Sequence, residues 1–285
     1  MLHAEDPAVP IVDSHVHIFT RDMPLVSTAW NRPEYGFTAE DLIQTLDAHG
    51  VHFAVIAGIS LYGVYNDYMI EMLRQYPRLR GTVNVLPTVA RSELDAMKDA
   101  GVIGVRLFLA EQLAGEVADI RSEDYQRLLR RVRDLDWHIH FLAQDDIFAD
   151  ALDVLRASGV KLVIDHHARP PDHEGVESPK LAAALRAVDA GNAWIKISAG
   201  FRFSPRNPPR TADDYARARD REALFDRYLL DRVGPERLLW GSDCPFVGHE
   251  GAVTYGDVLD NFRHAVPDAG VRRKISDTAL KFYFS

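Results

Sequence analysis

Short apolar runs alternate with amphipathic segments along most of the chain, and this alternation predicts strands followed by helices. The apolar runs predicted as strands are Ile11–His17, Phe53–Ile59, Gly81–Leu86, Gly104–Leu109, Trp137–Leu142, Lys161–Asp165, Ala193–Ser198 and Arg237–Gly241. The segments predicted as helices are Ala39–His49, Asn66–Tyr76, Ser92–Ala100, Ser122–Asp134, Asp146–Ser158, Pro179–Asp189, Thr211–Val233, Tyr255–Ala265 and Ala269–Phe282.

Continuously apolar strands separated by helices are typical of a parallel sheet that is covered by those helices. Eight such units in 285 residues predict an α/β fold, a single (β/α)8 TIM barrel domain over residues 1–285, regular or distorted, with an extra C-terminal helix. The alternative is an open doubly wound sheet. No Gly-x-Gly-x-x-Gly follows the first predicted strand, which disfavours a dinucleotide-binding version of that alternative.

Composition excludes several classes of protein and partner. A single cysteine, Cys244, rules out an internal disulfide and a thiolate metal site. The net charge of −9 argues against nucleic acid or an anionic membrane as the main partner. No apolar run approaches the length of a transmembrane helix, and Met1–Pro10 lacks the pattern of a signal peptide, so we expect a cytoplasmic protein.

The first predicted strand ends in His-x-His. Residues two apart on a strand point the same way, so His15 and His17 should project from one face. Two imidazoles on one face can bind a metal or polarise a substrate oxygen. The alternative is that one histidine is buried for structural reasons and the other is exposed.

Polar side chains also gather where other predicted strands end. The active site of a (β/α)8 barrel lies at the carboxyl ends of its strands, so these side chains are candidates for one site. They include Ser60, Tyr62 and Asn66 after the second strand, Arg106 on the fourth, Asp165, His166 and Arg169 at the sixth, Arg202 after the seventh, and Asp243 and His249 after the eighth. The long segment between Phe19 and Gly36 fits a loop that reaches over such a site.

Four motifs together resemble the amidohydrolase superfamily, and within it the amidohydrolase-2 branch that contains the 2-pyrone-4,6-dicarboxylate lactonases. They are Val12-Asp-Ser-His-Val-His, Gly101-Val-Ile-Gly-Val-Arg-Leu, Val163-Ile-Asp-His-His-Ala-Arg-Pro and Leu239-Trp-Gly-Ser-Asp-Cys-Pro. The motifs follow the family order from about Pro10 to the end of the chain. The resemblance implies a TIM-barrel hydrolase of the kind that acts in aromatic degradation.

The resemblance implies a role for each catalytic candidate. Asp243 would be the general base that activates water. His15, His17 and His166 would either hold one divalent metal ion, zinc or manganese, together with Asp243, or bind the substrate carbonyl directly without a metal. His167 should point the opposite way along its strand and serve a structural role.

Other matched positions would bind the substrate. Arg106 and Arg202 suit a carboxylate, because guanidinium groups bind carboxylates through two parallel hydrogen bonds. Their alternatives are a buried ion pair for Arg106 and simple exposure for Arg202. The remaining candidates for substrate contact are Ser60, Asn66, Tyr62 and His249.

Three departures from the family pattern bear on the metal and the substrate. Leu142 stands where many metal-dependent relatives have a histidine, while His138 and His140 lie earlier on the same strand, as ligands or as satisfied core histidines. The fourth strand lacks the bridging lysine or glutamate of binuclear relatives. The segment Ala110–Leu113 lacks the second arginine of the lactonases.

The sequence therefore predicts a hydrolase that opens a carboxylated lactone or similar cyclic ester by attack of water activated by Asp243. One alternative is a metal-dependent decarboxylase of an aromatic or unsaturated acid, and another is a barrel that binds a carboxylated ligand without catalysis. The expected partner is a small molecule, and the sequence is compatible with a monomer or a homo-oligomer.

Overall fold

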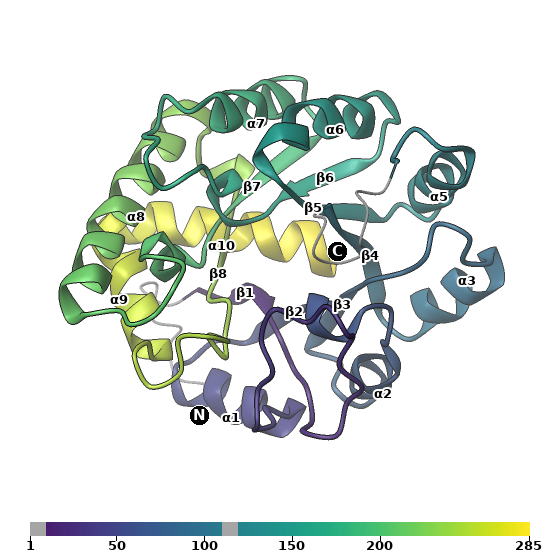
Figure 1. Ribbon diagram of the computed structural model, residues 1–285, viewed down its shortest axis with the longest axis horizontal. Helices are drawn as coiled ribbons and strands as arrows, with labels where there is room; N and C mark the ends of the chain where they lie inside the picture. Colours follow the sequence, from purple (N-terminus) through teal and green to yellow (C-terminus); the bar gives the residue numbers. More distant parts are fainter. Residues whose placement is uncertain (1–9, 110–118) are drawn as a thin grey trace.

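The computed structural model describes residues 10–109 and 119–285. Within these ranges one parallel sheet of eight strands runs in chain order from β1 to β8, which confirms the predicted barrel (Figure 1). The strands are β1 (Val12–Val16), β2 (Phe53–Ala57), β3 (Leu79–Val83), β4 (Val102–Leu109), β5 (His138–Ala143), β6 (Lys161–Ile164), β7 (Ala193–Ser198) and β8 (Leu238–Gly241).

The first and last strands meet just beyond their carboxyl ends. A single bridge joins Val16 to Cys244, and it is flanked by hydrogen bonds from His17 N to Cys244 O and from Asp243 N to His15 O, both 2.8 Å. The barrel is therefore nearly closed, and the seam fixes the backbone of the two histidine positions against that of Asp243. Gly241 allows this approach, because a Cβ there would lie 2.7 Å from the Cβ of His15.

Helices alternate with the strands and surround the sheet (Figure 1). Their bounds are α1 (Ala39–Ala48), α2 (Asp67–Gln75), α3 (Arg91–Asp99), α5 (Glu123–Asp134), α6 (Asp145–Ala157), α7 (Pro179–Asp189), α8 (Ala212–Val233), α9 (Tyr255–Ala265) and α10 (Ala269–Phe284). Short 3-10 turns follow several strands: η1 (Ser60–Tyr62), η2 (His166–Ala168), η3 (Gly200–Phe203) and η4 (Pro235–Arg237). None of the helices in the described ranges is long and apolar enough to cross a bilayer.

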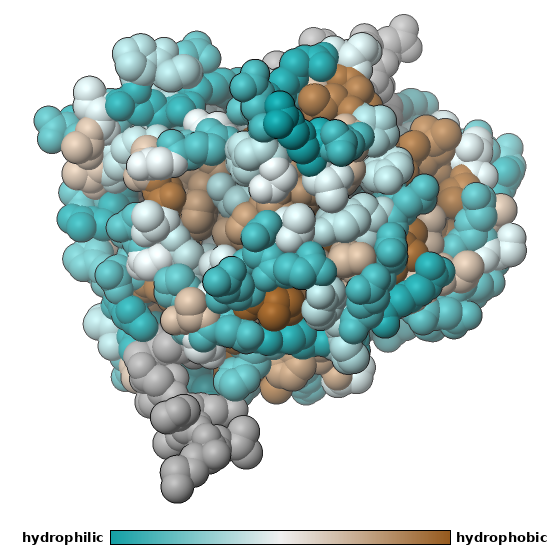
Figure 2. All heavy atoms as spheres, turned by 90° about the horizontal axis from the view of Figure 1, so that it is seen from below, coloured by the Kyte–Doolittle hydropathy of each residue, from teal (hydrophilic) through white to brown (hydrophobic). Residues whose placement is uncertain are grey.

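The extra C-terminal helix α10, yellow in Figure 1, closes the amino-terminal end of the barrel. Its Ala279 and Tyr283 pack in one cluster with Ile11, Val55 and Val163, which belong to the starts or interiors of the strands. This apolar plug leaves the opposite, carboxyl end of the barrel as the polar one. On the face shown in Figure 2, apolar side chains form small patches scattered among hydrophilic ones.

The predicted strand Gly81–Leu86 is displaced, because β3 spans Leu79–Val83. Asn84 ends this strand: its side-chain amide donates to the carbonyl oxygens of Ile59 and Gly63 and ties the chain to the loop after β2. The apolar residues that follow therefore belong to the loop, and Leu86 is 60% exposed. The other predicted elements differ from the observed bounds by two residues or fewer.

Candidate active site

Two histidines from β1 and the aspartate after β8 converge at the seam. His17 Nε2 lies 3.2 Å from Asp243 Oδ1, and His15 Nε2 lies 3.6 Å from the same oxygen. His17 Nδ1 donates to the carbonyl oxygen of Ala57 at 2.7 Å, which fixes the orientation of that ring. All three side chains are buried. The sequence prediction that His15 and His17 share one face is confirmed by this convergence.

Asp243 is also held by an arginine. Arg202 Nε, from the turn η3 after β7, donates to Asp243 Oδ2 at 2.6 Å. Burial raises the pKa of Asp243, but the positive charge of Arg202 and the close contact with the His17 ring outweigh it and hold that pKa well below the ordinary value. Asp243 is therefore a carboxylate at neutral pH, and its basicity is lowered while Arg202 remains bound.

His166 reaches the same place through an unusual backbone turn. Positions 166–169 all have positive φ, between 47° and 62°, although none of them is glycine. This conformation costs about 1–2 kcal/mol for each L-residue, and such strain is characteristic of functional sites. The turn places the His166 ring 4.6 Å from that of His15, with its Nδ1 2.8 Å from Ser198 Oγ. Burial lowers the pKa of His166 to about 3, so the ring is neutral.

His167 points away from this site, but not because a strand alternates. The strand β6 ends at Ile164, and the left-handed turn directs His167 outward to Asp226 on α8, with an Nε2 to Oδ1 distance of 2.6 Å. His167 thus points away from His166, as predicted, but the expected reason, alternation along a strand, is wrong. Its contact with Asp226 fastens the turn to α8.

A second acidic group lies one layer deeper in the barrel. Asp165 is fully buried, with Arg106 Nε 3.2 Å from its Oδ2 and Lys196 Nζ 3.5 Å from its Oδ1. Burial raises the pKa of Asp165, but the charges of Lys196 and Arg106 outweigh it and hold the pKa well below the usual range. Burial lowers the pKa of Lys196 to about 8, so its ammonium is largely protonated at pH 7.

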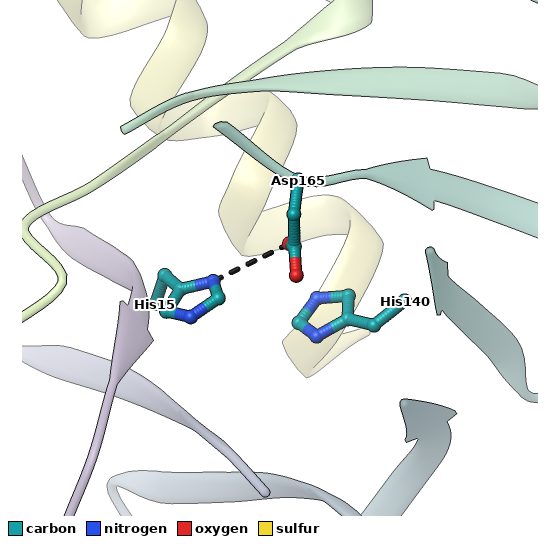
Figure 3. Close-up of side chains that lie close together, drawn as sticks. All are labelled: His15, His140 and Asp165. Atoms are coloured by element: carbon teal, nitrogen blue, oxygen red, sulfur yellow. Dashed lines mark ion pairs between the residues drawn. The ribbon is translucent and has the colours of Figure 1, made fainter. Parts of the chain in front are cut away.

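Three histidine rings lie close together in this deeper layer. The ring of His140 lies parallel to that of His15 at 5.8 Å, and His138 follows at 5.0 Å from His140. Figure 3 shows His15, His140 and Asp165 converging, with the 3.3 Å ion pair between His15 Nδ1 and Asp165 drawn as a dashed line. The Nε2 atoms of His15, His138 and His140 are buried and have no hydrogen-bond partner among the described residues.

The mouth of the site carries the guanidinium of Arg169. Arg169 ends the left-handed turn, and its side chain forms no hydrogen bond or ion pair within residues 10–109 and 119–285. Burial and the positive charges of Arg202 and Arg206 lower its pKa to about 10. An anion bound at the mouth would relieve this accumulation of positive charge.

Trp30, from the long loop after β1, reaches across the mouth. Its Nε1 donates to Ser60 Oγ at 3.3 Å, and the Arg202 guanidinium lies 5.9 Å from its ring centre. A Cβ at Gly248 would lie 3.4 Å from the ring, so the loop after β8 is also close. Trp30 is still 47% exposed, and it thus stands between the buried site and solvent.

The other predicted substrate contacts divide into two groups. Ser60 lies at the mouth beneath Trp30, and His249 stands near Arg202, with its Nδ1 3.0 Å from Tyr215 Oη. Asn66 instead binds the loop after β3, where its amide donates to Val64 O and Asn84 O. Tyr62 is buried in an apolar cluster.

Comparison with known proteins agrees with this geometry. The amidohydrolase family model matches residues 12–284. The chain belongs to the amidohydrolase family. A 2-pyrone-4,6-dicarboxylate hydrolase from Comamonas testosteroni is 27% identical, covering 96% of this chain and 90% of that protein. A 4-sulfomuconolactone hydrolase from Rhizobium radiobacter is 26% identical, covering 92% and 86%.

A crystal structure from Acinetobacter baumannii, described as a probable 2-pyrone-4,6-dicarboxylic acid hydrolase with citric acid bound, is similar over the whole barrel. It has a TM-score of 0.86 and 27% identity, with 96% of this chain and 99% of that one covered. The family resemblance predicted from the four motifs is thereby confirmed.

In this amidohydrolase two groups of side chains have the types and spacing that could hold a metal ion. One comprises His15, His17 and Asp243, and the other His15, His140 and Asp165. Both already contain a cation of the chain, because Arg202 binds Asp243 at 2.6 Å and Lys196 Nζ lies within 3.5 Å of all three members of the second group. In the second group Lys196 lies among the three donors. In the first group Arg202 binds only Asp243 Oδ2, so His15 Nε2, His17 Nε2 and Asp243 Oδ1 are left as donor atoms that fit a metal ion.

Four residues of the site in this amidohydrolase have no role predicted from the sequence: Lys196, Asp165, Arg169 and Trp30. Asp165 and Arg169 flank His166 in a motif that was recognised, and their position at a strand end was the available signal. Lys196 sits within an apolar strand, Ala193–Ser198, where a lone lysine is itself unusual because charged groups are seldom fully buried without a partner. The segment Ala110–Leu113 lies outside the described residues.

Proposed function

We propose that this amidohydrolase opens a lactone or similar cyclic ester that carries at least one carboxylate. The observation that carries the proposal is the buried, ionised Asp243 at the carboxyl end of the barrel, surrounded by His15, His17 and His166 and paired with Arg202. The relatives named for hydrolysis of 2-pyrone-4,6-dicarboxylate and 4-sulfomuconolactone support this substrate class.

In the proposed reaction Asp243 takes a proton from water as the water oxygen attacks the lactone carbonyl. The carbon–oxygen double bond becomes a single bond, and negative charge develops on the carbonyl oxygen. Ring nitrogens of His15 and His166 bind this oxygen, and His17 keeps the Asp243 carboxylate in place. The tetrahedral intermediate then releases the ring oxygen, which receives the proton from Asp243, and the product is an open-chain hydroxy acid or its tautomer.

Arg202 connects substrate binding to the basicity of the Asp243 carboxylate. While it binds Asp243 at 2.6 Å, it stabilises the ionised carboxylate and makes that carboxylate a weaker proton acceptor. A substrate carboxylate that draws the guanidinium toward itself would relax this effect. Arg202 is therefore proposed to anchor the substrate and to release Asp243 for catalysis when the correct anion arrives.

Arg169 supplies the second cation that an anionic substrate requires. It stands near Arg202 and Arg206, and its guanidinium has no protein partner in the described residues. Arg106, by contrast, is engaged by Asp165 and by Gly58 O at 2.8 Å, so we assign it to the structure of the site rather than to direct substrate contact. The citrate bound to the Acinetobacter protein supports a polycarboxylate-binding mouth.

The proposed reaction requires no metal ion. A zinc or manganese ion held by His15, His17 and Asp243 would polarise the carbonyl oxygen, and in the proposed reaction ring nitrogens of His15 and His166 do this instead. The steps assigned above use only side chains of this chain and water.

The deciding experiment measures initial ring-opening rates on a panel of lactones that includes 2-pyrone-4,6-dicarboxylate, before and after treatment with a chelator. Turnover that survives the chelator, prefers carboxylated lactones and is lost in Asp243→Asn supports the proposal. Release of carbon dioxide from an aromatic acid would identify a decarboxylase instead. Ligand-induced thermal stabilisation without turnover on any substrate would identify a binding protein.

A further inference from the structure

Lys196 is a fully buried lysine at the centre of the barrel. It lies on β7, and its Nζ is 3.1 Å from His15 Nδ1, 3.5 Å from His140 Nδ1 and 3.5 Å from Asp165 Oδ1. These three side chains are one of the two groups with the donor types of a metal site. The ammonium of Lys196 thus takes the place that a metal ion would occupy among them.

The contact with Lys196 decides which nitrogen of His15 carries the proton. An ammonium group only donates hydrogen bonds, so His15 Nδ1 must accept from it. Asp165 Oδ1 also lies near this nitrogen, at 3.3 Å, but the contact with Lys196 Nζ is shorter, at 3.1 Å, and favours the form in which Nδ1 accepts. A neutral imidazole that accepts at Nδ1 carries its proton on Nε2.

The proton on Nε2 faces the reaction site. His15 Nε2 is buried, has no hydrogen-bond partner among the described residues, and lies 3.6 Å from Asp243 Oδ1. A buried donor without a partner is costly, and such groups in native proteins call for an explanation. This geometry offers an explanation: the N–H group at His15 Nε2 donates to an oxygen of the substrate when the substrate binds.

We propose that Lys196 is a positioning residue that acts as an internal cation, holding His15 in the form that donates from Nε2 and preventing its use as a metal ligand. This inference rests on the proposed function for its catalytic consequence, but the protonation state of His15 can be measured without any substrate. Without Lys196, the His15 proton would move to Nδ1 and be donated to Asp165. Nε2 would then carry a lone pair.

The first test uses the unmodified protein. Long-range proton–nitrogen correlation spectra of protein labelled with ¹⁵N-histidine distinguish the two neutral forms of imidazole, and the His15 signals are identified by their absence in His15→Gln. We expect His15 to carry its proton on Nε2. A wild-type spectrum in which Nδ1 carries the proton would overturn the proposal, whatever the outcome for lactone hydrolysis.

The second test removes the cation with Lys196→Met, which keeps a side chain of similar length. We expect the His15 proton to move to Nδ1 and kcat to fall by about 10²-fold with a smaller change in KM, as for loss of one oxyanion donor. We also expect the variant to bind one zinc ion more than the wild type in an equilibrium titration.

Thr82→Val is the matched control. Thr82 Oγ lies 3.1 Å from His140 Nδ1 in the same buried layer, and valine has nearly the same shape. This variant should keep the wild-type His15 spectrum, zinc stoichiometry and kcat. An Lys196→Met protein that keeps the Nε2 proton, or that binds no more zinc than the wild type, would contradict the role of Lys196 as an internal cation. Should Lys196→Met not fold, the wild-type spectrum alone decides.

Discussion

The barrel contains two carboxylates with similar partners, and their surroundings differ in one respect. Asp243, at the mouth, is paired with Arg202, whose side chain retains 16% exposure. Asp165, one layer deeper, is paired with Lys196, which is completely buried, and with Arg106. The upper pair can exchange partners with a ligand, whereas the lower pair cannot. A carboxylate paired with a cation thus takes part in the proposed reaction at the mouth, whereas one layer deeper such a pair lies beside His15 and holds its orientation.

The largest effect should come from the upper carboxylate. Asp243→Asn removes the proton acceptor but keeps the size of the side chain, so kcat for ring opening should fall by about 10³- to 10⁴-fold, near the upper range for general-base catalysis. Initial rates on the preferred lactone measure this change. A circular dichroism spectrum and melting temperature close to those of the wild type serve as the control, and unchanged turnover would refute the role of Asp243.

The lower carboxylate should affect stability instead. Asp165→Asn leaves Lys196 and Arg106 buried without a counter-charge, so the free energy of unfolding should fall by about 3–5 kcal/mol. Urea denaturation followed by fluorescence gives this value. Asp136→Asn is the control, because that carboxylate pairs with Lys161 at the surface, where such pairs contribute about 1 kcal/mol or less. Equal losses in the two variants would contradict the distinction between layers.

The two arginines sharpen the comparison. Arg202→Gln should lower kcat/KM for a carboxylated lactone by about 10- to 100-fold, the usual range for a hydrogen bond to a charged group. A neutral lactone should lose less, because Asp243 becomes a stronger base without Arg202. Competition between the two substrates measures the ratio directly. Arg106→Gln, the matched variant in the lower layer, should mainly lower stability, and a loss of carboxylate preference there would reverse our assignment of the two arginines.

Much of the barrel was predictable because burial on both faces leaves apolar strands at regular intervals. Where prediction erred, local polar contacts decided: Asn84 ends β3 early, and the left-handed turn after Ile164 redirects His167. Asp243, His15 and His17 were predictable because they lie at strand ends in sequence. Lys196 was not, since its partners come from β1, β5 and the end of β6, and only the closed sheet brings them together.

The smallest effect concerns His138, whose ring meets that of His140 edge-on deep in the barrel. Burial lowers its pKa from 6.5 to about 3, so between these values the unfolded chain binds a proton that the folded one does not. Stability must therefore fall as the pH falls below 6.5, by about 2 kcal/mol from this residue between pH 7 and pH 5. His138→Leu should remove that share of the loss, measured as the difference in unfolding free energy at the two pH values.

His173→Gln is the control for this last effect, because the His173 side chain is 83% exposed and its replacement leaves the buried histidines unchanged. Its pH dependence of stability should equal that of the wild type. A His138→Leu variant with the same acid sensitivity as the wild type would show that His138 is already protonated in the folded barrel. The deeper layer would then hold three positive charges, on Lys196, Arg106 and His138, against the single carboxylate of Asp165, and its difference from the upper layer would no longer be one of exposure alone.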